Sequence, residues 1–312
     1  MEDRSLKLRL GTRRSKLALT QSNWVKAQIE EKCPHVEVEL VKITTKGDKI
    51  LDVPLSKVGG KGLFVKEIEE ALLDGRIDFA VHSLKDVPTE LPDGLEVSIF
   101  PEREDPRDAL VSRDGKGLME LAPGAAVGTS SLRRMAQLRA ARQDLKIEPL
   151  RGNLDTRLRK LDEGGFQAII LAVAGLRRMG LSARITEILP YTIMLPAIGQ
   201  GALGLEFRSA DSHTRDVLVR LHHEDTALMV RAERAFLARL EGGCQVPMGA
   251  YAVLEGDEIL LTGFVADEEG KRMIRMETKG PASDPEAIGD ALGLEILHAG
   301  GKEILEEVYG NS

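Results

Sequence analysis

The chain has 312 residues, of which 42% are hydrophobic and 30% are charged. These values are ordinary for a globular protein and exclude a disordered or fibrous one. The 43 Lys and Arg residues against 50 Asp and Glu residues give a formal net charge of −7, which argues against a general nucleic-acid-binding protein. Two cysteines are too few for a disulfide framework or a four-thiolate metal site. Because domains typically hold about 100–200 residues, two or three domains are expected.

No segment of the sequence has the character of a membrane anchor or an export signal. The N-terminal residues contain no apolar core long enough for a signal peptide. The longest apolar run, residues 168–176, is far shorter than the roughly 18 residues that span a bilayer. We therefore expect a soluble, cytoplasmic protein with no membrane partner.

Charge is distributed unevenly along the chain. Residues 129–178 contain nine Arg and two Lys against five acids, whereas residues 224–312 contain eight Lys and Arg against eighteen acids. A guanidinium group can bind a carboxylate or a phosphate through two hydrogen bonds. Most of these arginines are expected on solvated helix faces. The pairs Arg13–Arg14 and Arg133–Arg134 stand in loops rich in Gly, Ser and Thr, and there we favour an anion ligand.

The first part of the chain predicts a βαβ arrangement. Alternating hydrophobicity predicts strands over residues 6–10, 36–43 and 77–81. Helical periodicity predicts helices over residues 17–31 and 64–73. Pro34 ends the first helix, and Gly75 is the expected C′ residue of the second. A turn over residues 11–15 is expected between the first strand and the first helix.

The same order of elements recurs after residue 124. The expected strands lie over residues 125–127, 146–150 and 167–173, and the expected helices over residues 132–143 and 154–161. Gly11-Thr12 and Gly128-Thr129 are counterparts, because each follows the first strand of its copy. A helix N-terminus at such a place presents free N–H groups to an anion. We expect two similar α/β domains whose ligand lies at the carboxyl ends of the strands, in a cleft between them.

Two crossover segments, residues 101–106 and 195–201, are expected to join these domains and to form a hinge that permits closure. A strand over residues 203–207 is expected to return to the first domain. The C-terminal part predicts a small, acidic α+β domain, with helices over residues 225–240 and 285–308 and strands over residues 250–254, 258–266 and 272–279. The expected domains are residues 1–101 plus 202–219, residues 107–195, and residues 224–312.

Cys244 is the most singular residue of the sequence. Cys244 lies in a loop between two glycines and Pro247, where a thiol could be a nucleophile, an attachment point or a small half-buried side chain. Cys33 ends a helix and is expected to be structural. Asp86 follows a strand that is expected to be buried. It could orient an amine, transfer a proton, stabilise a cation or cap a turn.

The remaining candidates give weaker signals. His82 near a strand end is more often structural, and the spacing of the six histidines indicates no metal site. Residues 58–64 are Gly-rich but do not form a Walker A motif, because Gly62 follows Lys61. A mobile loop over a cleft and a plain surface loop both remain open for this segment.

The spacing of the motifs alone predicts a protein whose two domains close on a bound small polyanion. It does not determine a reaction. A non-catalytic binding protein is one alternative, because the two-domain plan resembles periplasmic solute-binding proteins. A phosphate-handling transferase is another, which the missing P-loop disfavours.

Nine motifs, in order along nearly the whole chain, resemble those of the porphobilinogen deaminases, also called hydroxymethylbilane synthases. They are GTRRSKLALTQ (11–21), KVGGKGLFVKE (57–67), AVHSLKDVP (80–88), EREDPRDA (102–109), VGTSSLRR (127–134), RGNLDTRL (151–158), ILAVAGLRR (170–178), LPAIGQGA (195–202) and EGGCQVPMGAY (241–251).

This resemblance implies an enzyme of tetrapyrrole (haem) biosynthesis. Such an enzyme joins four porphobilinogen molecules head to tail, loses ammonia each time and releases hydroxymethylbilane. A dipyrromethane cofactor, built from the substrate, is bound by a thioether to a loop cysteine that matches Cys244. The fold implied is two periplasmic-binding-protein-like α/β domains with a hinge and a small α+β C-terminal domain. The family further implies a monomer whose partner is its substrate.

The resemblance also implies roles for individual residues. Asp86 matches the catalytic acid, which would stabilise the azafulvene-like cation that forms as ammonia leaves. The residues implied to bind the cofactor are Ser83, Lys85, Thr129, Ser131, Arg133, Arg134, Gly152 and Arg157. Those implied to bind substrate are Arg13, Ser15, Gln21, Arg151, Arg178 and Gln200. Lys57, Lys61 and Phe64 would belong to the active-site loop.

Overall fold

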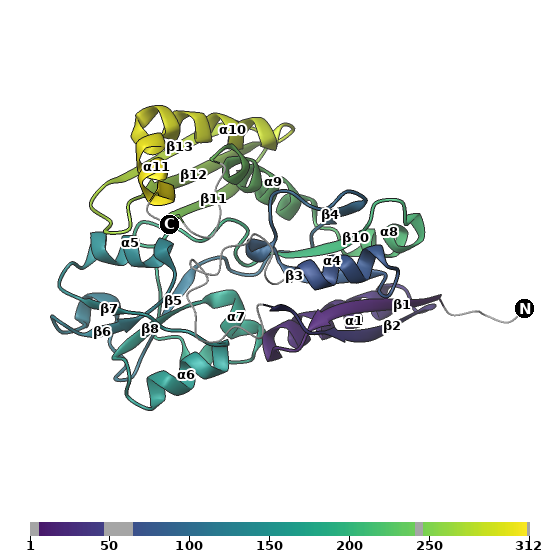
Figure 1. The fold of residues 1–312 in the computed structure, drawn as a ribbon, viewed down its shortest axis with the longest axis horizontal. Helices are drawn as coiled ribbons and strands as arrows, with labels where there is room; N and C mark the ends of the chain where they lie inside the picture. The colour runs from purple at the N-terminus through teal and green to yellow at the C-terminus, as the bar shows by residue number, and fades with distance from the viewer. Residues whose placement is uncertain (1–5, 47–64, 241–245, 311–312) are drawn as a thin grey trace, which may run out of the picture. The chain divides into compact units, whose positions relative to one another are not determined.

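The computed structural model describes residues 6–46, 65–240 and 246–310, which fall into two compact units (Figure 1). Of the described residues, unit 1 comprises residues 6–46, 65–104 and 202–227. Unit 2 comprises residues 105–201, 228–240 and 246–310. The three domain ranges expected from the sequence stay a prediction.

Unit 1 is built on a five-stranded sheet in the order β2-β1-β3-β10-β4. Its strands are β1 (Leu6–Arg13), β2 (Val36–Ile43), β3 (Phe79–Ser83), β4 (Leu95–Ile99) and β10 (Leu203–Arg208). Strand β1 is parallel to β2 and β3, whereas β10 is antiparallel to β3 and β4. The chain therefore returns to its first sheet through β10, as the sequence predicts.

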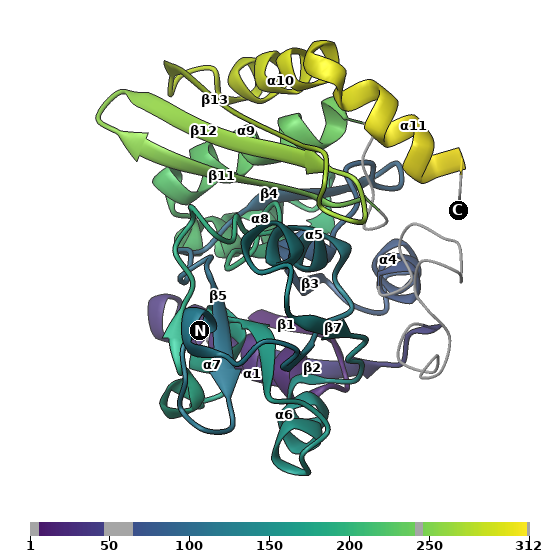
Figure 2. The same cartoon turned by 90° about the vertical axis from the view of Figure 1, so that its left-hand side faces the viewer.

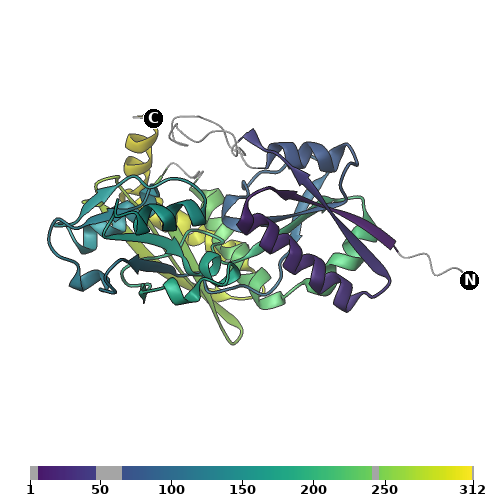
Figure 3. The ribbon, with the colours of Figure 1, turned by 90° about the horizontal axis from the view of Figure 1, so that it is seen from below.

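Helices cover both faces of this sheet. Helix α1 (Lys16–Lys32) lies along one face, where Val25 and Ile29 pack against apolar side chains of β1, β2 and β3 (Figure 3). Helix α8 (Ser212–Leu218) contributes Leu218 to the same core. Helix α4 (Lys66–Leu73) covers the opposite face through Ile68 and Leu72. The buried Cys33 packs in the α1 core, which confirms its structural role.

Three buried polar side chains interrupt the apolar layer beneath α4. His82 Nε2 lies 2.8 Å from Glu206 Oε2, and both residues are at most 5% exposed. Glu69 of α4 faces the same layer. Burial raises the pKa of Glu69 from 4.5 to about 7, and the negative charge of Glu206 adds to this effect. His82 thus has a buried polar partner on the neighbouring strand.

Unit 2 contains a second five-stranded sheet with an equivalent topology, in the order β7-β6-β8-β5-β9. Its strands are β5 (Asp108–Ser112), β6 (Ala126–Gly128), β7 (Lys146–Glu148), β8 (Ala168–Ala172) and β9 (Glu187–Ile188). Strand β6 is parallel to β7 and β8, and β5 is antiparallel to β8 and β9. In both sheets the antiparallel fourth strand directly follows a crossover segment. This shared plan confirms two similar α/β domains.

The second sheet is also covered on both faces. Helix α5 (Leu132–Ala141) packs on one face through Leu138, and helix α6 (Leu154–Asp162) packs on the other through Leu158 and Leu161. Helix α7 (Val173–Arg178) joins the α6 face. The sequence predicts that the strand extends to residue 173. The strand instead ends at Ala172 and α7 begins at Val173, because a helical turn buries Val173 and Leu176 together.

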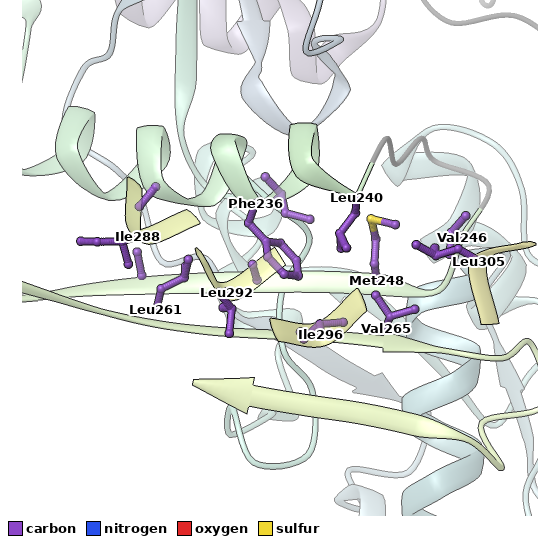
Figure 4. Close-up of a cluster of buried hydrophobic side chains, with 14 of the residues drawn as sticks. Phe236, Leu240, Val246, Met248, Leu261, Val265, Ile288, Leu292, Ile296 and Leu305 are labelled. Atoms are coloured by element: carbon purple, nitrogen blue, oxygen red, sulfur yellow. The ribbon is translucent and has the colours of Figure 1, made fainter. Parts of the chain in front are cut away.

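The C-terminal part of unit 2 is a three-stranded antiparallel sheet in the order β11-β12-β13. The strands are β11 (Met248–Glu255), β12 (Glu258–Ala266) and β13 (Met273–Pro281). Helices α9 (Glu224–Arg239) and α10 (Pro285–Ile296) pack on one face, with Phe236 central in the core (Figure 4). A Cβ atom on Gly263 would lie 2.8 Å from Phe236 Cζ, so a glycine lets the ring approach the sheet.

The final helix is broken, although the sequence predicts a continuous helix over residues 285–308. A π-helical turn (Leu297–Gly301) separates α10 from α11 (Lys302–Gly310), and Figure 2 shows α11 turned away from the axis of α10. Gly300 has φ 104°, a conformation that interrupts a regular helix and that glycine adopts readily. The break allows Ile304, Leu305 and Val308 to enter the same core as α10.

Phe236→Ala should lower the free energy of unfolding by about 3–5 kcal/mol, because it removes a fully buried ring and leaves a cavity. Urea unfolding followed by circular dichroism measures the loss. Met119→Ala is the control, since Met119 is 65% exposed and its truncation should change the value by less than about 0.5 kcal/mol. Equal effects of the two substitutions would contradict the packing described for this core.

Glu69→Gln should flatten the dependence of stability on pH between 4.5 and about 7. The folded protein binds the Glu69 proton more tightly than the unfolded chain, so this residue makes stability fall as pH rises through that window. Glutamine does not titrate and removes this contribution. Melting temperatures of both proteins at pH 5 and pH 8 test the prediction. An identical shift of melting temperature in the two proteins would contradict it.

Candidate functional site

In unit 1, two of the predicted substrate-binding residues lie where β1 passes into α1. Strand β1 continues to Arg13 because its last three residues pair with β2, so the turn predicted from Gly11 is wrong at its beginning. Ser15 is the N-cap of α1, and its Oγ accepts a hydrogen bond from the Ala18 N–H at 3.3 Å. The first turn of α1 contains no acidic residue, so the positive end of the helix is not neutralised locally.

Gln21 and Ser83, which come from distant parts of the sequence, meet in unit 1. The buried Gln21 side chain donates a hydrogen bond from Nε2 to Ser83 Oγ at 3.0 Å. This contact joins α1 to the end of β3. The structure therefore brings together one predicted substrate-binding residue and one predicted cofactor-binding residue.

Lys85 and Asp86 lie on a single 3₁₀ turn (Leu84–Asp86) directly after β3. Leu84 is buried, and its N–H donates to the Ala202 carbonyl oxygen at 3.0 Å, which ties the turn to the start of β10. Lys85 is half-buried and Asp86 is exposed. The Asp86 carboxylate is thus accessible to a ligand on a turn whose backbone is held by the sheet.

In unit 2, Thr129 and Ser131 form the junction between β6 and α5. The Thr129 N–H donates to the Glu148 carbonyl oxygen at 2.9 Å, and Thr129 Oγ1 accepts from the Ser131 N–H at 3.2 Å. Ser131 occupies the N-cap position of α5, whose first turn contains no acidic residue. The first N–H groups of a helix have no intrahelical acceptor, so this end of α5 suits an anionic ligand.

Arg133 and Arg134 meet at Asp108, a fully buried residue to which the sequence assigned no role. Arg133 Nη1 lies 2.8 Å from Asp108 Oδ2, and Arg134 Nη2 lies 2.6 Å from Oδ1. Burial alone would raise the pKa of Asp108, but the two guanidinium groups hold it well below its usual range. The cluster therefore contains two buried cations against one carboxylate, an excess of positive charge beside the N-terminus of α5.

Further hydrogen bonds tie this cluster to both crossover segments. Arg133 donates to the Leu195 carbonyl oxygen at 2.6 Å, and Gln200 Nε2 donates to the Pro106 carbonyl oxygen at 2.6 Å and to Asp108 Oδ1 at 3.0 Å. The buried Gln200 and the two arginines thus belong to one cluster with protein partners. That they also bind a ligand stays a prediction.

The segment between β7 and α6 holds three more of the predicted residues. Gly152 has φ +112°, and a Cβ atom there would lie 2.6 Å from Thr156 Cγ2, so glycine is required. The Gly152 carbonyl oxygen accepts a hydrogen bond from Arg157 Nε at 2.7 Å. Arg151 and Arg157 are both half-buried. Two guanidinium groups therefore border this turn while keeping part of their surface exposed.

Arg178 is the last residue of α7 and donates from Nη2 to the Gly201 carbonyl oxygen at 2.7 Å. It is half-buried and contacts the second crossover segment.

Cys244 and the predicted loop residues Lys57, Lys61 and Phe64 lie outside the described residues. Their roles stay predictions.

Sequence reasoning missed Asp108 and Glu206. Asp108 is part of the EREDPRDA motif, but four acids in one short polar segment do not reveal which of them is buried. Glu206 is an acidic residue between the apolar residues Leu205 and Phe207 of β10, and this break in the apolar run is its local signal in the sequence.

Residues 8–216 match the family model of the porphobilinogen deaminase dipyrromethane cofactor binding domain, and residues 227–298 match that of its C-terminal domain. The porphobilinogen deaminase of Maridesulfovibrio salexigens is 60% identical over 97% of this chain and 98% of its own length. That of Geobacter sulfurreducens is 56% identical over 97% of this chain and 95% of its own length.

Among solved structures, an ancestral arginine-binding protein bound to arginine is similar over 69% of this chain and 90% of that chain, at 16% identity and a TM-score of 0.37. A similarity this distant says nothing about a ligand. The family models and the two relatives, by contrast, cover nearly the whole chain. The chain belongs to the porphobilinogen deaminase family.

Proposed function

We propose that this chain condenses four porphobilinogen molecules head to tail into hydroxymethylbilane, with Asp86 as the catalytic acid and Cys244 as the attachment point of a dipyrromethane. Membership of the porphobilinogen deaminase family supports the activity and the cofactor. The observation that carries the residue assignment is the exposed Asp86 carboxylate beside Lys85, on a turn fixed to the sheet through Leu84.

The donor groups of unit 2 suit a dipyrromethane, because this group bears several carboxylates. Arg151 and Arg157 offer partly exposed guanidinium groups, and the N-terminus of α5 offers N–H groups. When bound, the dipyrromethane supplies the primer to which the first substrate is joined. The role of these side chains is to bind its carboxylates and hold its orientation.

The cluster around Asp108 contributes charge as well as structure. Two guanidinium groups against one carboxylate leave an excess positive charge beside Thr129 and Ser131. In a buried setting such charge acts more strongly than in water. Asp108 orients Arg133 and Arg134, and the excess charge attracts the carboxylates of the cofactor or the growing chain.

In unit 1, Asp86 and Lys85 provide groups of opposite charge on one turn. Arg13 binds carboxylates of the substrate and Lys85 binds those of the cofactor, whereas the Asp86 carboxylate accepts a hydrogen bond from the aminomethyl ammonium group of the substrate. As ammonia leaves, positive charge develops on the pyrrole of that substrate. A carboxylate placed beside this charge lowers the barrier. The substrate then reacts as an electrophile at its methylene carbon. The new carbon–carbon bond forms to the free α-carbon of the acceptor pyrrole, whose C–H bond breaks as the proton leaves.

The same proposal includes a monomer that acts in the cytoplasm, with porphobilinogen as its partner and without nucleic acid or membrane. The acidic composition supports the absence of nucleic acid. Within residues 6–46, 65–240 and 246–310, no helix has both the length and the apolar character that crossing a membrane requires.

Asp86→Asn should lower kcat by about 10²–10⁴-fold with little change in KM, because the amide cannot neutralise the developing cation. Porphobilinogen consumption and ammonia release, measured together, give both constants and test whether one ammonia leaves per substrate. Asp93→Asn is the matched control, since Asp93 is also exposed and follows the same strand without a proposed role. A normal kcat in Asp86→Asn would remove this residue from the mechanism.

A further inference from the structure

The buried pair of His82 and Glu206 lies immediately before the turn that carries Lys85 and Asp86, and the proposed mechanism does not use it. His82 is the fourth residue of β3, and Glu206 is the fourth residue of the neighbouring strand β10. Along β3, Phe79 and Val81 face the α1 core, so His82 points to the opposite face, which α4 covers.

A buried polar pair of this kind is weak evidence for a contribution to stability. Replacing a buried charged pair by apolar side chains of similar volume is often neutral or stabilising. Glu206 Oε1 is buried and lacks a hydrogen-bond partner among the described residues, which is unfavourable. Unlike an apolar contact, the pair has a preferred geometry, and it therefore constrains how the two strands lie relative to each other. A hydrogen bond of 2.8 Å fixes the distance and the angle between two neighbouring strands.

That constraint acts at the end of β3, where the proposed active-site turn begins. In the ladder between β3 and β10, His82 pairs with Gly204 and Ser83 pairs with Leu203. The next contact is the hydrogen bond from the Leu84 N–H to the Ala202 carbonyl oxygen. The side-chain pair thus reinforces the last three backbone contacts before Lys85 and Asp86.

Glu69 is the titratable group that faces the pair from α4, and Lys66 and Glu70 of the same helix act on it electrostatically. Burial favours the protonated form of Glu69. Within the pair, His82 Nε2 lies 2.8 Å from Glu206 Oε2. The three side chains form a polar layer in which His82 is the link to the active-site strand.

We propose that His82 and Glu206 are positioning residues, which hold the carboxyl end of β3 so that Lys85 and Asp86 meet the cofactor and the substrate in the productive geometry. The inference rests on the proposed function, because it assigns the pair to the same reaction. Small displacements of a reacting group lower the rate strongly even when the fold is intact.

The experiment compares three variants of the holoenzyme, with cofactor content checked by intact mass. His82→Leu breaks the pair and leaves Glu206 without its partner. His82→Leu/Glu206→Met removes both polar groups and keeps the volume. His82→Gln keeps a nitrogen donor in the same direction. Ile29→Val, in the core of α1 and away from β3's end, is the control for a mild loss of packing. Melting temperature, kcat and KM are measured for each.

The double variant is the decisive one. We expect its melting temperature to remain close to that of the wild type, while kcat falls by about tenfold or more and KM changes by less than about threefold. His82→Gln should restore kcat to within about threefold of the wild type. A purely structural pair predicts instead that the double variant regains both stability and kcat, and that result would overturn the inference.

The outcomes separate this inference from the proposed function. If the wild type fails to consume porphobilinogen, the proposed function fails and the inference fails with it. If the wild type is active and every variant matches Ile29→Val in kcat, the inference alone fails. If His82→Leu does not fold, the double variant and His82→Gln still decide, because neither leaves a buried carboxylate without a partner.

Discussion

The arrangement of unit 2 depends on one buried carboxylate, Asp108, held between two guanidinium groups. Removal of Asp108 would leave Arg133 and Arg134 buried without their counter-charge, which costs about 3–5 kcal/mol for a buried pair. Because Gln200 also donates to Asp108, the cluster joins β5, α5 and the second crossover segment. The direction of α5 follows from these contacts. Two guanidinium groups against one carboxylate therefore place positive charge in the core of unit 2.

Unit 1 has the same sheet topology and also has a buried acid on its antiparallel strand. In each sheet the antiparallel strand that follows a crossover supplies a buried acid, Asp108 on β5 and Glu206 on β10. Each acid binds a basic group from a neighbouring element, the arginines of α5 in one unit and His82 of β3 in the other. In both units this internal contact lies close to residues proposed to touch the ligand. Buried polar contacts of this kind fix the relative orientation of neighbouring elements more than they add to stability.

Local hydrophobic periodicity and the order of the motifs predicted most of the fold. Contacts between residues distant in the sequence could not be predicted. Strand β2 was predicted with its observed bounds, and the repeated βαβ plan and the return of β10 were confirmed, because each depends on local periodicity. The contact between His82 and Glu206 joins residues 124 positions apart and leaves no periodic trace. The break at Gly300 was missed because one glycine among good helix formers is weak evidence for an interruption. The motifs identified the family, whereas the roles of Asp86 and Cys244 stay predictions.

The central claim is that this chain carries a dipyrromethane, built from porphobilinogen and attached at Cys244. Intact mass of the purified protein before and after incubation with porphobilinogen tests it most directly. Wild type and Cys33→Ser should both show the mass of the chain plus one dipyrromethane, either at once or after incubation, because Cys33 is buried in the core of unit 1. Cys244→Ser should show no stable addition. A wild-type mass that stays at the bare chain, or an equal addition in Cys244→Ser, would contradict the account.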